Sequence, residues 1–135
     1  MMDLLLSLNI WAVLVAATLH FLLGAVWYSV LFPSVWMKLR GITEADIGEP
    51  NPMTFVWTFL LQLVSAGTLG VILLATGIDT AHHGALVGFG AGAGLVFTLT
   101  GTTGLFSDSN IGLHFIDNGY HVLGLTIAGA VLGAW

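Results

Sequence analysis

The stretch IGLHFIDNGYHVLGLTIAGAVLGAW, residues 111–135, is long and apolar enough for a membrane-spanning helix, yet it carries several polar side chains. About 20 apolar residues suffice to cross a hydrocarbon core of about 30 Å. At about 100° per residue, the polar side chains fall within roughly 100° of arc, so a helix presents them as one stripe. They are His114, Asp117, Asn118 and His121. This polar stripe is the strongest indication of a functional site in the sequence.

The composition places the chain in a lipid bilayer. Of its 135 residues, 57% are hydrophobic and only 7% are charged, whereas a soluble domain is about 25% charged. The net charge of -5 includes only two basic residues, so the chain lacks the basic patch that nucleic acid binding requires. It has no cysteine, which excludes disulfides and thiolate chemistry. We therefore expect one integral membrane domain over residues 1–135, with lipid and not nucleic acid as its partner.

The apolar runs predict an all-α bundle of four transmembrane helices. Their expected ranges are about 4–32, 53–76, 80–103 and 111–134. Pro33 cannot continue the first helix cleanly, and residues 34–40 mix Trp36 with Lys38 and Arg40, as a short interfacial segment does. Asn51 before Pro52 predicts a helix start, because Asn caps helices and Pro suits the first helical position. Asp79 is a fair cap for the third helix.

Small residues recur at helical spacing in the last two predicted helices. Gly84, Gly88 and Gly92 form a ridge at intervals of four, and Gly129 and Gly133 make a second pair. Membrane helices use such residues to bring backbones close together, so we expect helix packing through these ridges. An alternative is a locally unwound helix that exposes carbonyl groups to a cavity. The ridges are also candidate contact faces between copies, and we expect a homo-oligomer.

Four spans place both termini on one side of the membrane. Lys38 and Arg40 are the only bases, and positive residues favour the cytoplasmic side. We therefore expect the Lys38/Arg40 loop to be cytoplasmic and both termini to lie outside.

Two motifs resemble a known family. The segment Leu23-Gly24-Ala25-Val26-Trp27-Tyr28-Ser29, with Phe32 and Trp36-Met37-Lys38 after it, resembles the first-helix signature of domain of unknown function 1761. The ending Asp117-Asn118-Gly119-Tyr120-His121, with Gly129-Ala130, is similar to that family's last helix. These are uncharacterised small bacterial membrane proteins. The resemblance implies a four-helix fold in a bacterial inner membrane, and it supplies no activity or cofactor.

Further polar residues extend the stripe into a predicted track. At 1.5 Å per residue, His121 lies about 15 Å into its helix, near the bilayer midplane. His20 is about as deep in the first helix, and Tyr28 and Arg40 should flank the shallow end. The track residues are His20, Tyr28, Arg40, His114, Asp117, Asn118 and His121. Ionisable groups inside a membrane usually serve a function or pair with a specific partner.

Three hypotheses account for the track. In the first, Asp117 supplies negative charge and the histidines relay protons or gate with pH. In the second, His114, Asp117 and His121, with or without His20, bind a divalent metal. In the third, Asp117 pairs with Arg40 or Lys38, and the histidines are neutral and hydrogen-bonded to Tyr28, Gln62 or a carbonyl group.

The leading functional prediction is a non-enzymatic membrane protein that binds or passes a small solute, ion or proton. The sequence contains no HExxH-type motif and no nucleophile paired with a base, which argues against an enzyme. The alternatives are an accessory or structural subunit of a larger membrane complex and an intramembrane metal-binding protein or metalloenzyme. A self-assembling chain favours the first role, and a monomer that co-purifies with other subunits favours the second.

Overall fold

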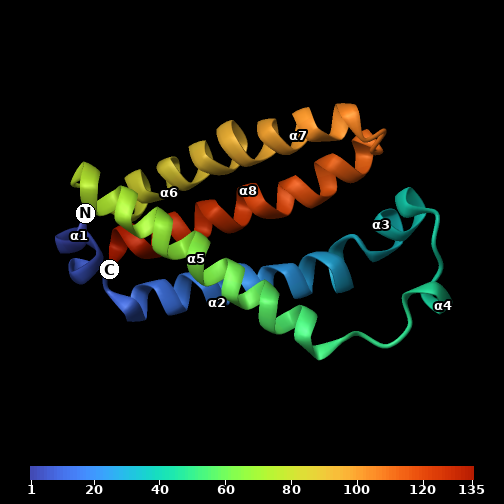
Figure 1. Cartoon of the computed structure of the whole chain (residues 1–135), viewed down its shortest axis with the longest axis horizontal. Helices are drawn as coiled ribbons and strands as arrows, with labels where there is room; N and C mark the ends of the chain where they lie inside the picture. The colour runs from blue at the N-terminus through green and yellow to red at the C-terminus, as the bar shows by residue number, and fades with distance from the viewer.

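The computed structural model describes residues 1–135 and is an all-helical bundle (Figure 1). Four helical stretches are long and apolar enough to cross a membrane, which confirms the predicted fold class. The first consists of α2 (Ile10–Val26) and a π-helical turn, η1 (Trp27–Leu31). The second is α5 (Pro52–Thr76), the third joins α6 (Ala81–Gly90), η2 (Ala91–Val96) and α7 (Phe97–Phe106), and the fourth is α8 (Ile111–Ala134).

Helix α8 is the centre of the bundle. It packs against α2, α5, α6, η2 and α7, and Figure 1 shows it between the third span and the pair formed by α2 and α5. The buried core is made mostly of small side chains, so these helices approach closely. Its members are Val13, Ala16, Ala17, Ala66, Leu69, Leu125 and Ala128.

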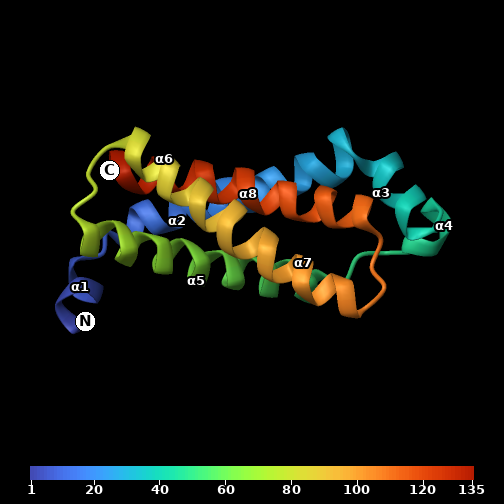
Figure 2. The ribbon, with the colours of Figure 1, turned by 90° about the horizontal axis from the view of Figure 1, so that it is seen from above.

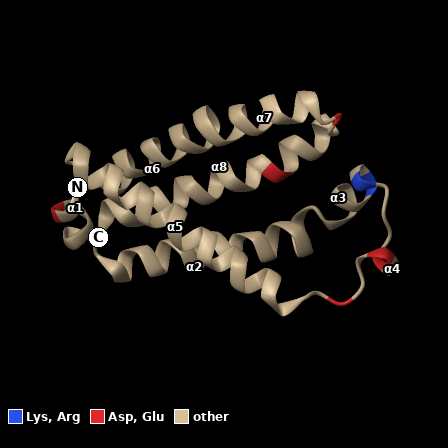
Figure 3. Cartoon of the chain, viewed as in Figure 1, with Lys and Arg blue, Asp and Glu red and all other residues tan.

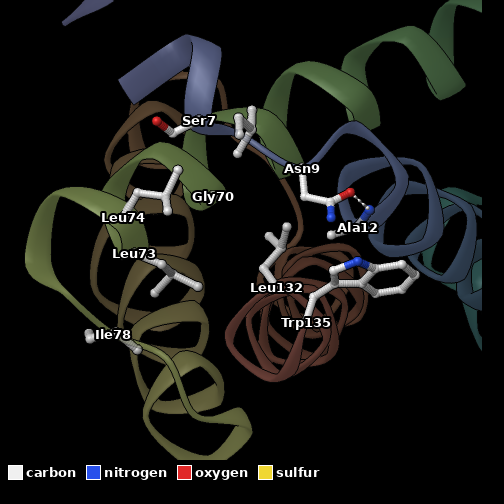
Figure 4. Close-up of a pocket in the computed structure, with 10 residues that line it drawn as sticks. Ser7, Asn9, Ala12, Gly70, Leu73, Leu74, Ile78, Leu132 and Trp135 are labelled. Atoms are coloured by element: carbon white, nitrogen blue, oxygen red, sulfur yellow. Dashed lines mark hydrogen bonds between the residues drawn. The ribbon is translucent and has the colours of Figure 1, made fainter. Parts of the chain in front are cut away.

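The first span begins later than the sequence predicts. A separate short helix, α1 (Met2–Ser7), ends at Leu8, whose backbone is extended. Asn9 then caps α2, because its Oδ1 accepts hydrogen bonds from the amides of Trp11 and Ala12 at 3.0 and 3.3 Å. Figure 4 shows the hydrogen bond to Ala12. The predicted continuous helix from residue 4 to residue 32 is therefore wrong at its start, and the span is Ile10–Leu31.

The other end of the first span is widened into the π-helical turn η1. The amide of Phe32 donates to the carbonyl oxygen of Trp27 at 2.9 Å, and Pro33 has no N–H with which to continue the ladder. Pro33 instead begins α3 (Pro33–Arg40), which Gly41 ends with φ +68°. This helix occupies the position of the predicted interfacial segment. Turns of the π type are frequent at functional sites.

A short connection leads from α3 to the second span. It contains α4 (Glu44–Ile47), where the amide and hydroxyl groups of Thr43 donate to the carboxylate of Asp46 at 2.8 and 2.9 Å. These hydrogen bonds lower the pKa of Asp46. Asn51 then caps α5, and Pro52 is its first residue, as the sequence predicts.

The third span begins at Ala81 with Thr80 as its cap, not Asp79, and continues to Phe106, beyond the predicted end at residue 103. Thr80 Oγ1 accepts a hydrogen bond from the amide of His83 at 3.3 Å. Asp79 precedes this position by one residue and cannot take the same role.

The glycine ridge of the third span faces α8 within the same chain. A Cβ atom on Gly84 would collide with the carbonyl oxygen of Gly129, and one on Gly92 would lie 2.7 Å from the Cα of Val122. The prediction that this ridge is a contact face between copies is therefore corrected, because the ridge is already covered. A homo-oligomer would need another surface.

The termini and the basic residues lie at opposite ends of the bundle. Both termini are near α1, and α3 and α4 are at the far end (Figure 1). The blue segment in Figure 3, which marks lysine and arginine, is on α3. The loop between α7 and α8 is at this same end (Figure 2).

Candidate functional site: a polar pocket between the first and last spans

A polar pocket opens where η1 and α3 meet α8. Its volume is about 470 Å³, which is within the range of small-molecule sites. It is lined by Tyr28, Trp36, Arg40, Leu113, Asp117 and His121. Four of the seven predicted track residues, Tyr28, Arg40, Asp117 and His121, therefore line one pocket.

The carboxylate of Asp117 is held by a tyrosine and not by a base. The hydroxyl of Tyr28 donates to Asp117 Oδ1 at 2.7 Å. Arg40 instead places its guanidinium group over the ring of Trp36, with Cζ 4.9 Å from the ring centroid, which is a cation–π geometry. The ion pair between Asp117 and a base, considered in the third hypothesis, is not formed. The side chain of Asp117 therefore has a tyrosine and no basic residue as its hydrogen-bond partner.

Two histidines meet where the pocket borders the interior of the bundle. His121 lines the pocket, and its ring centroid is 5.7 Å from that of His20. His20 is only 3% exposed, and its Nε2 atom is buried without a hydrogen-bond partner. Buried polar atoms are seldom left unsatisfied, and an exception calls for an explanation. His20 is thus the least satisfied group of the site.

Glycine makes room for the His20 ring. A Cβ atom on Gly124 would collide with Cδ2 and Nε2 of His20. The ring is also enclosed by Tyr120, whose ring centroid is 4.9 Å away. The shape of α8 at this point therefore fixes the histidine in place.

Tyr120 and Gln62 are site residues that the track prediction omitted. Gln62 Nε2 donates to the hydroxyl oxygen of Tyr120 at 2.8 Å, and that hydroxyl lies 3.3 Å from the carbonyl oxygen of His20, to which it donates. Both residues are about 6% exposed. A glutamine within an apolar run is the signal that could have included α5 in the site.

The other two stripe residues face away from the pocket. The side-chain nitrogen Nδ2 of Asn118 donates to the backbone carbonyl oxygen of His114. The same nitrogen lies 2.9 Å from Nδ1 of the His114 ring. Thr100 on α7 donates to Asn118 Oδ1 at 2.8 Å, and the ring centroids of His114 and Phe97 are 4.4 Å apart. His114 and Asn118 therefore connect α8 to the third span.

The split follows from helix geometry. At about 100° per residue, Asp117 and His121 form one edge of the stripe, and His114 and Asn118 form the other edge. One edge faces η1 and α2, and the other faces α7. A stripe of roughly 100° is wide enough to reach two neighbouring helices.

The predicted metal site is corrected by the same geometry. The structure brings no group of three or more His, Asp or Glu side chains close enough to hold a metal ion. His114 is committed to Asn118, while Asp117 and His121 line the pocket on the other side. His114, Asp117 and His121 are therefore not a ligand set.

The fold and this site define a class of protein, a helical membrane protein with four candidate spans and a polar pocket between the first and last of them. A family model described as "Protein of unknown function (DUF1761)" matches residues 11–133, and the chain belongs to this family. The match confirms the resemblance noted at both ends of the sequence. No curated protein and no solved structure matches the chain.

Proposed function

We propose that the protein binds a proton or a small cation in the polar pocket and passes it toward the middle of the membrane. Asp117 is the anionic ligand at the entrance, His121 is the next acceptor, and His20 is the innermost acceptor. The observation that carries the proposal is the unpartnered Nε2 atom of His20 beside His121, which shares its pocket with Asp117.

The chemistry of the three groups supports this role. A carboxylate without an ion pair attracts positive charge, and the ring nitrogens of histidine can accept and release a proton. Intramembrane ionisable residues are costly and commonly mark ion or proton pathways. Trp36 and Tyr28 supply aromatic walls, and their ring centroids are 5.8 Å apart. Arg40 also lines the pocket, where its guanidinium group lies over the Trp36 ring.

Proton flux in proteoliposomes tests this proposal. The purified protein is reconstituted with a trapped pH-sensitive dye, and a potassium diffusion potential drives protons inward. We expect flux above that of protein-free vesicles, and a loss of about tenfold or more in Asp117→Asn and His121→Ala, because a lost proton-transfer group typically costs that much or more.

A matched control separates the loss of the proton pathway from the general effect of replacing a histidine. His83 is exposed near the start of α6, so His83→Ala should keep the flux of the parent protein. Equal flux in all variants, or flux no higher than in empty vesicles, would show that Asp117 and His121 form no proton pathway.

We further propose that α3 and α4 lie in the cytoplasm of a bacterial cell, with the protein in the inner membrane. The support is the position of the two basic residues, Lys38 and Arg40, at the end opposite both termini.

Cysteine labelling tests the orientation, because the chain has no native cysteine. Glu49→Cys lies in the connection before α5, and Asp79→Cys lies in the loop before α6. In intact spheroplasts, a membrane-impermeant maleimide should label Asp79→Cys and leave Glu49→Cys unlabelled until the cells are lysed. The reverse pattern would invert the proposed orientation.

A further inference from the structure

A second cavity lies on the other side of Tyr28, between the first span and α5. Its volume is about 600 Å³, and α2 and α5 diverge on approaching the α4 end of the bundle (Figures 1 and 2). It is lined by Phe21, Gly24, Ala25, Tyr28, Ser29, Thr54, Phe55, Thr58 and Tyr120. No Asp, Glu, Lys, Arg or His is among these residues, so the cavity differs in charge from the polar pocket.

Small residues on the first span create the space. Gly24, Ala25 and Ser29 face bulky aromatic residues in the cavity wall. A Cβ atom on Gly24 would lie 3.1 Å from the hydroxyl oxygen of Tyr120, so glycine lets that ring form the inner wall. The small side chains of the first span therefore create this cavity.

Most hydroxyl groups of the cavity already have partners. Tyr28 donates to Asp117, Tyr120 is bonded to Gln62 and the carbonyl of His20, and Thr58 donates to the carbonyl of Thr54 at 2.7 Å. The side-chain hydroxyls of Ser29 and Thr54 form no hydrogen bond within the chain, although both residues line the cavity. They are the free polar groups of this site.

The two free hydroxyls are at one end of the cavity. Thr54 is in the first turn of α5, and Ser29 is in η1, close to α3. Phe21 is eight residues before Ser29, which corresponds to about 12 Å along a helix. The ring centroids of Phe21 and Phe55 are 6.5 Å apart at 79°, an edge-to-face pair. Phe55 directly follows Thr54 in α5, so the aromatic pair begins beside Thr54 and extends along the cavity wall to Phe21.

We propose that this cavity binds a neutral single-chain amphiphile, of the class of long-chain alcohols and monoacylglycerols. Its hydroxyl head exchanges hydrogen bonds with Ser29 and Thr54, and its chain packs along Phe21 and Phe55. The lining contains no counter-charge for a charged head, whereas a neutral hydroxyl head can exchange hydrogen bonds with Ser29 and Thr54. The site is independent of the proton pathway proposed above, although Tyr28 borders both cavities.

Photolabelling of the full-length protein in lipid nanodiscs tests the site. The probe is a long-chain alcohol with a diazirine on its chain, and unlabelled alcohol is the competitor. We expect saturable labelling at the cavity residues. Ala25→Leu places a larger side chain in the cavity and should reduce labelling about tenfold, which corresponds to about 1.4 kcal/mol of binding free energy.

The matched control is Ala93→Leu, which makes the same change in an apolar groove between η2 and α8. It should leave labelling unchanged. A fatty acid of the same chain length should compete much less well than the alcohol at a pH where it is ionised. Labelling that does not saturate, that is equal in both variants, or that the ionised acid displaces as well as the alcohol does would overturn the proposal.

Discussion

Gly88→Ala is expected to destabilise the bundle by about 1–3 kcal/mol or more, as overpacking of a tight core does. A Cβ atom on Gly88 would lie 2.7 Å from the carbonyl carbon of Leu125 and 3.1 Å from the Cα of Thr126. Both are backbone atoms of α8, so relief requires the two helices to move apart and not merely a side chain to rotate. Because α8 contacts every other span, this displacement would weaken the whole core.

Gly90→Ala is the matched control, two residues away in the same helix. A Cβ atom at Gly90 meets nothing within 4 Å, so alanine there should cause no loss and a gain of up to about 1 kcal/mol from helix propensity. Unfolding by sodium dodecyl sulfate in mixed micelles, followed by tryptophan fluorescence, measures both variants. Equal stability of the two would mean that the third span does not approach α8 as closely as the structure describes.

The sequence predicts the four spans well because their signals are local. Hydropathy and length define each span, and capping chemistry places the start of α5 at Pro52. The break at Asn9 was missed because the apolar run continues through it, although an asparagine before a helical run is a capping signal. The π-helical turn before Pro33 depends on how the proline is accommodated, which the sequence does not specify.

The sequence predicts the site in part. The depth of a residue along its helix follows from its position in the sequence, whereas the neighbouring helix that it faces depends on the packing of distant segments. Counting 1.5 Å per residue placed His20 and His121 at similar depths, and the structure brings their rings together. Residue depth alone does not show that His114 and Asn118 face α7 while Asp117 faces η1. The packing of the glycine ridge against α8 decides which neighbouring helix each edge of the stripe faces. This packing is a contact between segments that are distant in the sequence.

Gly124→Ala and His20→Ala are expected to be strongly coupled in stability. The alanine methyl group would occupy the position of the His20 ring, whose Cγ would be 2.7 Å away. A histidine ring can sometimes turn aside, but this one is 3% exposed and lies against the rings of Tyr120 and His121. Gly124→Ala alone should therefore cost about 1–3 kcal/mol.

Adding His20→Ala to Gly124→Ala removes the clash, so the double variant should be more stable than the sum of the single effects by about 0.5–3 kcal/mol. The unfolding assay in mixed micelles measures this double-mutant cycle, and strictly additive values would show that residue 124 does not constrain the ring. Proton flux then separates structure from chemistry. The double variant should regain stability relative to Gly124→Ala yet conduct no better than His20→Ala, because the imidazole that accepts the proton is still missing.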